Sequence, residues 1–267
     1  MKRKMFYALA SVIILLFYSC KKDSVSISTP TNSTLNNTLD TKSPTLDSGL
    51  LCYLPFNGNF KDKSGHHNNG KAFGSIAFTS DKAGNPLKAV SFAASNCWIE
   101  IPEAQFDGLE TGTIAMDFLS TSTARQLLIG KMSYSIPLNS PGWYQSFILV
   151  IQQGFSSPEQ FNSKQPGGCD QLNGWNAGMN SNASFSLNQW NHIAVTFSKT
   201  KEKMYLNGNL VAAASRVPSP ICQGEPIRLG VWWQNDPLFF TGKMDEVRIY
   251  NRVLSADEVQ QLFSVSK

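Results

Sequence analysis

The chain beyond Leu50 is a succession of short apolar runs separated by turn residues, and this pattern most restricts the fold. Each run has the length of a strand, and no helical pattern interrupts them before the last residues. Many short strands at close spacing predict an antiparallel β-sandwich or barrel. The runs are residues 50–56, 76–79, 89–92, 98–101, 113–119, 126–129, 147–152, 191–198, 203–206, 210–214, 227–232 and 243–250.

Two local signals fix details of this β-rich chain. Asn207-Gly208 separates two apolar segments, and this dipeptide supplies the two positive φ angles of a type I′ hairpin turn. Ser255 and Glu258 form the capping-box pattern that begins a helix, and the apolar residues of 259–263 follow it. We therefore expect one hairpin at Asn207-Gly208 and one short C-terminal helix.

The first twenty residues have the composition of an export signal. A basic start at residues 2–4 precedes an apolar run over residues 5–18, which is too short to cross a membrane comfortably. Residues 16–20 (LFYSC) resemble a bacterial lipobox, in which Cys20 becomes lipidated and forms the mature N-terminus. An ordinary secretory signal with a chance cysteine is the alternative. We expect an exported protein, lipid-anchored to the bacterial outer membrane or cell surface, which contacts the membrane through that anchor only.

Composition divides the remainder into a tether and one domain. Residues 21–48 are rich in Ser, Thr, Asn, Asp and Pro, and such a segment buries too little apolar surface to fold. The expected organisation is a signal peptide at 1–20, a disordered tether at 21–48 and a domain at 49–267. Without the three basic residues of the signal, the chain has 20 basic against 19 acidic residues. No basic cluster alternates with aromatic residues, so nucleic acid is not an expected partner.

Four of the five cysteines follow Cys20. An even number in an exported chain is consistent with two disulfides, and four cysteines allow three pairings. Their spacing matches no zinc site. The pairing that keeps each bridge within one half of the chain is Cys52–Cys97 and Cys169–Cys222.

Several blocks of sequence, taken in order, resemble a known family. They are residues 54–65 (LPFNGNFKDKSG), 81–85 (DKAGN), 89–92 (AVSF), 190–197 (WNHIAVTF), 205–208 (YLNG) and 242–252 (GKMDEVRIYNR). Together they resemble bacterial laminin G-like domains of the concanavalin A-like lectin/glucanase kind, over residues 50–263. The resemblance implies an all-β, two-sheet antiparallel jellyroll sandwich with a concave face. It does not identify a ligand, because this fold carries lectins, adhesion modules and glycosidases.

A glycosidase activity finds no support in the sequence. Laminarinase-type relatives carry two catalytic glutamates in an E-x-D-x-x-E pattern on one strand, and retaining chemistry needs two carboxylates about 5 Å apart. Glu100 and Glu103 have opposite strand parity, and Asp245 and Glu246 are adjacent and point to opposite faces. We therefore expect a binding domain and no enzyme.

A structural calcium ion is a further expectation. Asp245 shares strand parity with Val247 and Ile249, and a carboxylate on their apolar side is costly without compensation. Related jellyrolls hold calcium with an aspartate of the closing strand and oxygens of the N-terminal turn. The resemblance therefore implies Asp62 and Asp245 as ligands. The alternative is that Asp245 accepts hydrogen bonds from the first loop and that Asp62 caps a turn.

The expected ligand surface is aromatic. Trp232 and Trp233 point to opposite faces, and Trp233 shares the parity of Leu229, so Trp232 is expected on the concave face. The polar segment 133–185 carries further aromatic residues, and flat amphipathic rings suit sugar faces. The expected partner is a glycan, and an extracellular protein in an adhesion contact is the alternative. The predicted ligand-binding residues are Trp143, Tyr144, Trp175 and Trp232, with local packing of each ring as the competing interpretation.

Overall fold

A computed structural model of the 267-residue chain describes the domain and parts of its loops. Residues 1–44, with the predicted export signal and most of the predicted tether, lie outside the described part. The described residues are 45–93, 96–102, 105–133, 145–151, 159–161, 179–181, 183–215, 222–232, 234–235 and 237–266.

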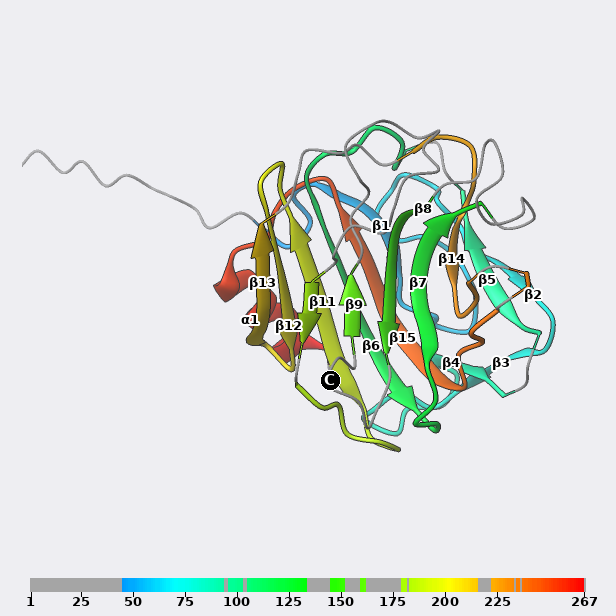
Figure 1. The fold of residues 1–267 in the computed structure, drawn as a ribbon. Coiled ribbons are helices and arrows are strands. Elements are labelled where there is room, and N and C mark those ends of the chain that lie inside the picture. Colours follow the sequence, from blue (N-terminus) through cyan, green and yellow to red (C-terminus); the bar gives the residue numbers. More distant parts are fainter. Residues whose placement is uncertain are drawn as a thin grey trace, which may run out of the picture. The chain divides into compact units, whose positions relative to one another are not determined.

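Two antiparallel sheets form the domain, which confirms the predicted sandwich (Figure 1). One sheet has eight strands. In spatial order they are β13 (Asn209–Ser215), β12 (Lys201–Leu206), β11 (Asn191–Phe197), β6 (Gly112–Ser120), β15 (Gly242–Tyr250), β4 (Ala89–Phe92) and β3 (Ile76–Thr79), and β1 (Leu50–Leu54) pairs with β15.

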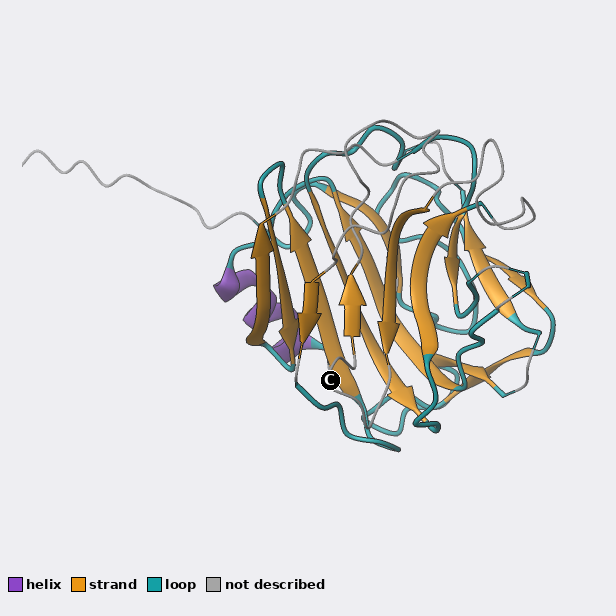
Figure 2. Ribbon diagram, viewed as in Figure 1, coloured by secondary structure: helices purple, strands orange, loops and turns teal. Residues whose placement is uncertain are grey.

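The second sheet has seven strands. In spatial order they are β10 (Met179–Ser181), β9 (Glu159–Phe161), β8 (Gln145–Ile151), β7 (Gln126–Met132), β14 (Ile227–Leu229), β5 (Trp98–Ile101) and β2 (Lys71–Phe73). The strands of both sheets run as two layers in Figure 2. The main hydrophobic core lies between the sheets, because it draws residues from both of them.

Strand alternation decides which side chains enter that core. On β6, Ile114, Met116 and Phe118 are core residues, while Ala115 and Asp117 point to the opposite side of the sheet. We call this opposite side the outer face of the eight-stranded sheet. Part of it is covered, so polar residues such as Asp117 and His192 are buried there.

The cover is the single described helix, α1 (Ala256–Val265), drawn in purple in Figure 2. Val259 and Leu262 of α1 pack with Ala194 and Tyr205 of the outer face in a second apolar cluster. Ser255 caps the helix, and its hydroxyl accepts a hydrogen bond from the Glu258 N–H, while the Glu258 carboxylate accepts one from the Ser255 N–H. The predicted capping box and C-terminal helix are confirmed. No helix among the described residues is long and apolar enough to cross a membrane.

The predicted hairpin is also confirmed. Asn207 and Gly208 have φ angles of 50° and 79° and join β12 to β13. The sequence pattern did not reveal β2, β9 and β10, each of which is three residues long. It also overestimated β14, which ends at Leu229 because Gly230 takes a φ of 84°. A side chain at that position would collide with the Phe92 ring.

Candidate functional site

Asp245 lies on the outer face of the eight-stranded sheet, and not beside Val247 and Ile249 as strand parity predicts. A β-bulge causes this difference. The register of β15 against β6 shifts between Asp245 and Arg248, and Glu246 in the bulge has a φ of 53°. Because the extra residue reverses the alternation, Asp245 pairs with Asp117 on the outer face, while Val247 and Ile249 stay in the main core.

Asp245 therefore belongs to a buried polar cluster with Asp117 and His192. The three are 7%, 2% and 2% exposed and occupy paired positions on β15, β6 and β11. Lys82 lies 3.6 Å from Asp117 and hydrogen-bonds to Ser266, which itself donates to Asp117. Within the described part of the chain, Oδ1 of Asp117 and Nδ1 of His192 have no hydrogen-bond partner.

Burial controls the ionisation of this cluster. Loss of solvent raises the pKa of Asp245 to about 8, and the neighbouring Glu246 and Asp117 charges act in the same direction. Burial also raises the pKa of Asp117 to about 6, although Ser266 and Lys82 oppose it. The pKa of His192 falls to about 3 because burial and the nearby Lys82 and Arg248 charges disfavour the imidazolium. The cluster lies beneath the C-terminal segment and offers no open carboxylate pair.

Asp62 lies in the first loop and braces it. Its carboxylate accepts hydrogen bonds of 2.8–2.9 Å from the backbone N–H groups of Tyr53, Ser64 and Asn68. The Ser64 hydroxyl adds a fourth hydrogen bond at 2.7 Å. Hydrogen bonding to these donors lowers the pKa of Asp62 despite partial burial.

Asp62 and Asp245 lie in different surroundings, and calcium binding by these two residues stays a prediction. Four hydrogen bonds occupy the oxygens of Asp62, and the carboxylates whose charges act on Asp245 are Glu246, Asp117 and Asp81. Among the described residues, no three His, Cys, Asp or Glu side chains are grouped to hold a metal ion. We therefore derive no role for calcium.

Trp232 lies outside the main core, on the side of the seven-stranded sheet that its alternation with Leu229 predicts. It is only 5% exposed and packs with Leu127, Met132 and Ile148. The Arg125 guanidinium lies 5.6 Å from its ring centroid. Trp143, Tyr144 and Trp175 lie outside the described residues, so their part in a ligand surface stays a prediction.

The cysteines differ from the predicted framework. Cys52 keeps a free thiol in the core, directed at the Asn68 carbonyl oxygen, so the predicted Cys52–Cys97 bridge does not form. Burial raises the pKa of the Cys52 thiol well above its usual range. Cys222 is disulfide-bonded. Cys169 and Cys20 lie outside the described residues, so the Cys169–Cys222 pairing and the lipidation of Cys20 stay predictions.

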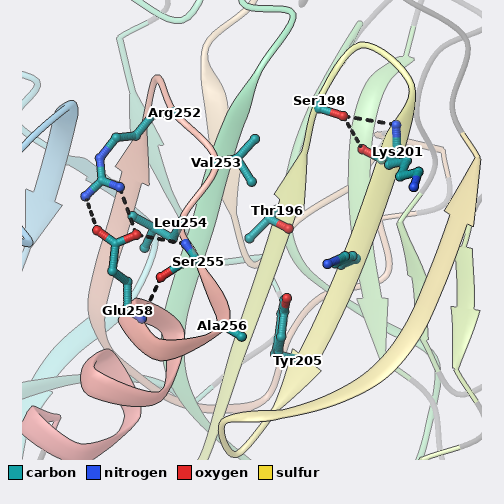
Figure 3. Close-up of a pocket in the computed structure, with 11 residues that line it drawn as sticks. Thr196, Ser198, Lys201, Tyr205, Arg252, Val253, Leu254, Ser255, Ala256 and Glu258 are labelled. Carbon is teal, nitrogen blue, oxygen red and sulfur yellow. Dashed lines mark hydrogen bonds and ion pairs between the residues drawn. The ribbon is translucent and has the colours of Figure 1, made fainter. Parts of the chain in front are cut away.

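A cavity of about 480 Å³ opens on the outer face, between β11, β12 and the start of α1 (Figure 3). Its volume lies in the range of small-molecule sites. Tyr205 is 3% exposed, and in Figure 3 its hydroxyl points toward Thr196. Val253 contributes an apolar side chain that is 43% exposed. Lys201 and Lys203, both exposed, bring ammonium groups to the lining.

One ion pair forms the wall of this cavity next to α1. Oε2 of Glu258 accepts hydrogen bonds from Arg252 at 3.0 Å and from the Ser255 N–H at 2.8 Å, and Oε1 lies 2.7 Å from the Arg252 guanidinium in the ion pair. The hydrogen bonds from Arg252 contribute most to lowering the pKa of Glu258. Arg252 is held in place by the Ser48 carbonyl oxygen at 2.6 Å. Glu258 is the one carboxylate among the residues that line the cavity, and its oxygens are occupied.

Sequence analysis missed this cavity. Its residues come from segments 196–205 and 252–258, which only tertiary packing brings together. The available signal was the alternation of Lys201, Lys203 and Tyr205, which places all three on one side of a strand beside the predicted hairpin.

Comparison with known proteins identifies the family. The sequence profile of the concanavalin A-like lectin/glucanases superfamily, in its laminin G form, matches residues 98–260, which is more than half of the chain. The chain belongs to this superfamily. None of the curated proteins matches it in sequence. The family assignment confirms the resemblance seen in the sequence and the jellyroll fold that it implies.

Solved structures of the superfamily fold include several binding domains. Domain 4 of an extracellular arabinanase from Geobacillus stearothermophilus, in complex with arabinotriose, is 22% identical with a TM-score of 0.58, and the match covers 80% of this chain and 97% of that one. The binding domain of Paraclostridial Mosquitocidal Protein 1 is 16% identical with a TM-score of 0.62, over 82% and 52% of the two chains. The binding domain of botulinum neurotoxin DC, in complex with SialylT, is 14% identical with a TM-score of 0.57, over 83% and 52%. This superfamily domain therefore spans about half the length of the toxin domains, and these similarities establish the fold alone.

Proposed function

We propose that this superfamily domain binds a carbohydrate and performs no catalysis. The observation that carries the proposal is the match to nearly the whole of the arabinanase domain, whose structure contains arabinotriose. A botulinum neurotoxin domain of the same fold is in complex with SialylT, and another study of botulinum neurotoxin type C concerns two ganglioside molecules. The neighbours are thus mostly binding domains, in a fold that also serves glycosidases.

The cavity of Figure 3 is the proposed ligand site. It combines hydroxyl and ammonium groups with the exposed apolar side chain of Val253, which suits a molecule with both polar and C–H faces. The face around Trp232 is a separate surface, on which that ring is 5% exposed. Together with Trp143, Tyr144 and Trp175, Trp232 remains a second candidate surface for ligand binding.

Charge placement in the cavity supports binding without hydrolysis. Glycoside hydrolysis requires two carboxyl groups that flank the scissile bond, about 5 to 9.5 Å apart. Glu258 is the single carboxylate of the lining, and Arg252 and Ser255 already hold it. Asp117 and Asp245 are paired, but they are buried under the C-terminal segment.

The proposed location is the cell surface. The basic start, the apolar run and Cys20 would direct export and lipid anchoring, and residues 21–48 would hold the domain away from the membrane. A surface position would give the domain access to extracellular glycans.

A protein partner is the second candidate function. Its support is a botulinum neurotoxin DC binding domain of this fold in complex with rat synaptotagmin II. In that case the domain would bind a peptide or protein ligand, and added sugars would not change that binding.

A glycan-array screen tests the proposal, with Ala256→Trp as the informative variant. Ala256 is exposed and lines the cavity, so an indole there would fill the space without entering the core. Gln261→Trp is the matched control, because Gln261 is exposed on the same helix and does not line the cavity. We expect glycan binding that Ala256→Trp abolishes and Gln261→Trp preserves. A folded protein that binds no glycan would remove the proposal and favour a protein partner.

A further inference from the structure

The stability of the fold does not explain the placement of the two cavity lysines, Lys201 and Lys203. Lys201 and Lys203 occupy alternate positions of β12, so both side chains leave the same side of the sheet as Tyr205. Lys203 pairs with Thr196 of β11, which also lines the cavity. Lysines are common on edge strands, where they prevent strand addition, but β13 is the edge strand here and covers β12.

Neither ammonium group has an acidic partner in the cavity. Across the described residues, no hydrogen bond or ion pair joins Nζ of Lys201 or Lys203 to a carboxylate. The nearest acid in sequence, Glu202, is buried and points to the opposite side of the strand. Glu258 is engaged by Arg252 at 2.7 Å and by the Ser255 N–H at 2.8 Å. The cavity therefore carries an excess positive charge.

The uncharged residues that line the cavity restrict the chemical class of the ligand. Ser255 and Val253, both exposed, offer a hydroxyl group and apolar contact (Figure 3). Thr196 and Tyr205 also line the cavity but are only 2% and 3% exposed. A small inorganic anion would use the lysines and leave the apolar surfaces without contact. A molecule that joins an anionic group to hydroxyl groups and C–H faces matches all three kinds of surface.

We infer that the cavity recognises an acidic sugar residue of a glycan, with its negative group held between Lys201 and Lys203. This inference rests on the proposed function and specifies the ligand class. The lysines select the charge, and the Ser255 hydroxyl and the Val253 side chain contact the sugar ring. Because both ammonium groups are exposed, their effect weakens with salt, and recognition is strongest at low ionic strength.

The test compares two lysine pairs on matched ligands. The informative variant is Lys201→Gln/Lys203→Gln, and the control is Lys61→Gln/Lys63→Gln. The control pair has the same spacing and the same change in net charge, and both lysines are exposed on the first loop away from the cavity. The probes are trigalacturonate and its methyl ester, and sialyllactose and its methyl ester. Within each pair the ligands differ in the acidic group, and dissociation constants are measured by calorimetry.

The expected result is binding of at least one acidic probe, at least tenfold tighter than its neutral counterpart. The informative variant loses about tenfold or more of that affinity and binds the neutral counterpart as the unmodified protein does, while the control variant changes neither. Equal affinity for acidic and neutral probes would overturn the inference and leave the proposed function intact. An equal loss in both variants would also overturn it, because it would reflect net charge alone.

Two further outcomes separate the possible failures. Binding of poly-L-glutamate as tightly as the acidic sugars, with the same dependence on Lys201 and Lys203, would overturn the glycan assignment in favour of an acidic peptide. Absence of binding to every acidic and neutral sugar, by a protein whose unfolding transition is cooperative, would overturn the proposed function and this inference together.

Discussion

Replacing Asp245 by asparagine isolates the free-energy cost of burying a carboxylate on the outer face of the eight-stranded sheet. Asparagine keeps the shape and the oxygen that accepts a 2.8 Å hydrogen bond from the Glu246 N–H. It removes the charge that Glu246 and Asp117 repel. We expect Asp245→Asn to be more stable than the unmodified protein at neutral pH, by an amount that depends on pH.

The sign and size of this dependence follow from the pKa. Burial raises the pKa of Asp245 from 3.8 to about 8, so between these pH values the folded protein binds more protons than the unfolded chain. The free energy of unfolding therefore decreases as pH rises through this interval, by at most about 1.4 kcal/mol per pH unit. From pH 5 to pH 7, the stability advantage of Asp245→Asn should increase by up to about 3 kcal/mol.

His192 acts in the opposite direction in both proteins. Its pKa is lowered from 6.5 to about 3, so its contribution to stability increases as pH rises through that window. Because both proteins contain His192, this contribution largely cancels in the difference between them.

Urea unfolding at pH 5 and pH 7, followed by tryptophan fluorescence, measures the effect. Asp257→Asn is the control, because Asp257 is an exposed residue of the first turn of α1. The reasoning would be refuted if the difference between Asp245→Asn and the unmodified protein stayed constant or decreased between the two pH values.

Three further predictions concern stability and reactivity. Gly242→Ala should lower the free energy of unfolding in urea by more than about 3 kcal/mol, because the new Cβ would lie 1.9 Å from the Leu119 carbonyl oxygen at a φ of 147°. A loss below about 1 kcal/mol would contradict this geometry. Ser255→Ala should lower the free energy of unfolding by about 1 kcal/mol in the same assay, because the helix loses its N-cap. Ser264→Ala, in the last turn of the helix, is the control, and equal losses in both variants would argue against a specific cap. The Cys52 thiol should resist Ellman's reagent in the folded protein and react in urea, because it is buried and its pKa is raised. Rapid labelling of Cys52 in the folded protein, located by mass spectrometry, would contradict this burial.

The elements that sequence could predict are those specified by local chemistry. The hairpin at Asn207-Gly208 needs only the left-handed φ preference of those two residues, and the helix start needs only Ser255 and Glu258. Long strands such as β6 and β15 were identifiable because apolar residues recur along nine residues in each. Strands of three residues, such as β2, carry too little alternation to be distinguished from loops.

Features that depend on contacts distant in sequence were not predictable in this way. The bulge at Glu246 reverses the parity of β15, so an argument from strict alternation placed Asp245 on the wrong side of the sheet. The Cys52–Cys97 pairing relied on sequence position alone, whereas the Cys52 thiol points at the Asn68 carbonyl oxygen in the core. The cavity joins β11 and β12 to the start of α1, and no local pattern links those segments.

Chemical-shift mapping of backbone amides locates the bound glycan and so shows whether it occupies the cavity beside α1. On addition of the tightest-binding sugar from the array, the account predicts shifts concentrated at Thr196, Lys201, Tyr205 and Ala256, with saturation at the affinity measured by calorimetry. Shifts concentrated around Trp232 and Ile148 instead, on the opposite sheet, would contradict the account and move the site to the seven-stranded sheet.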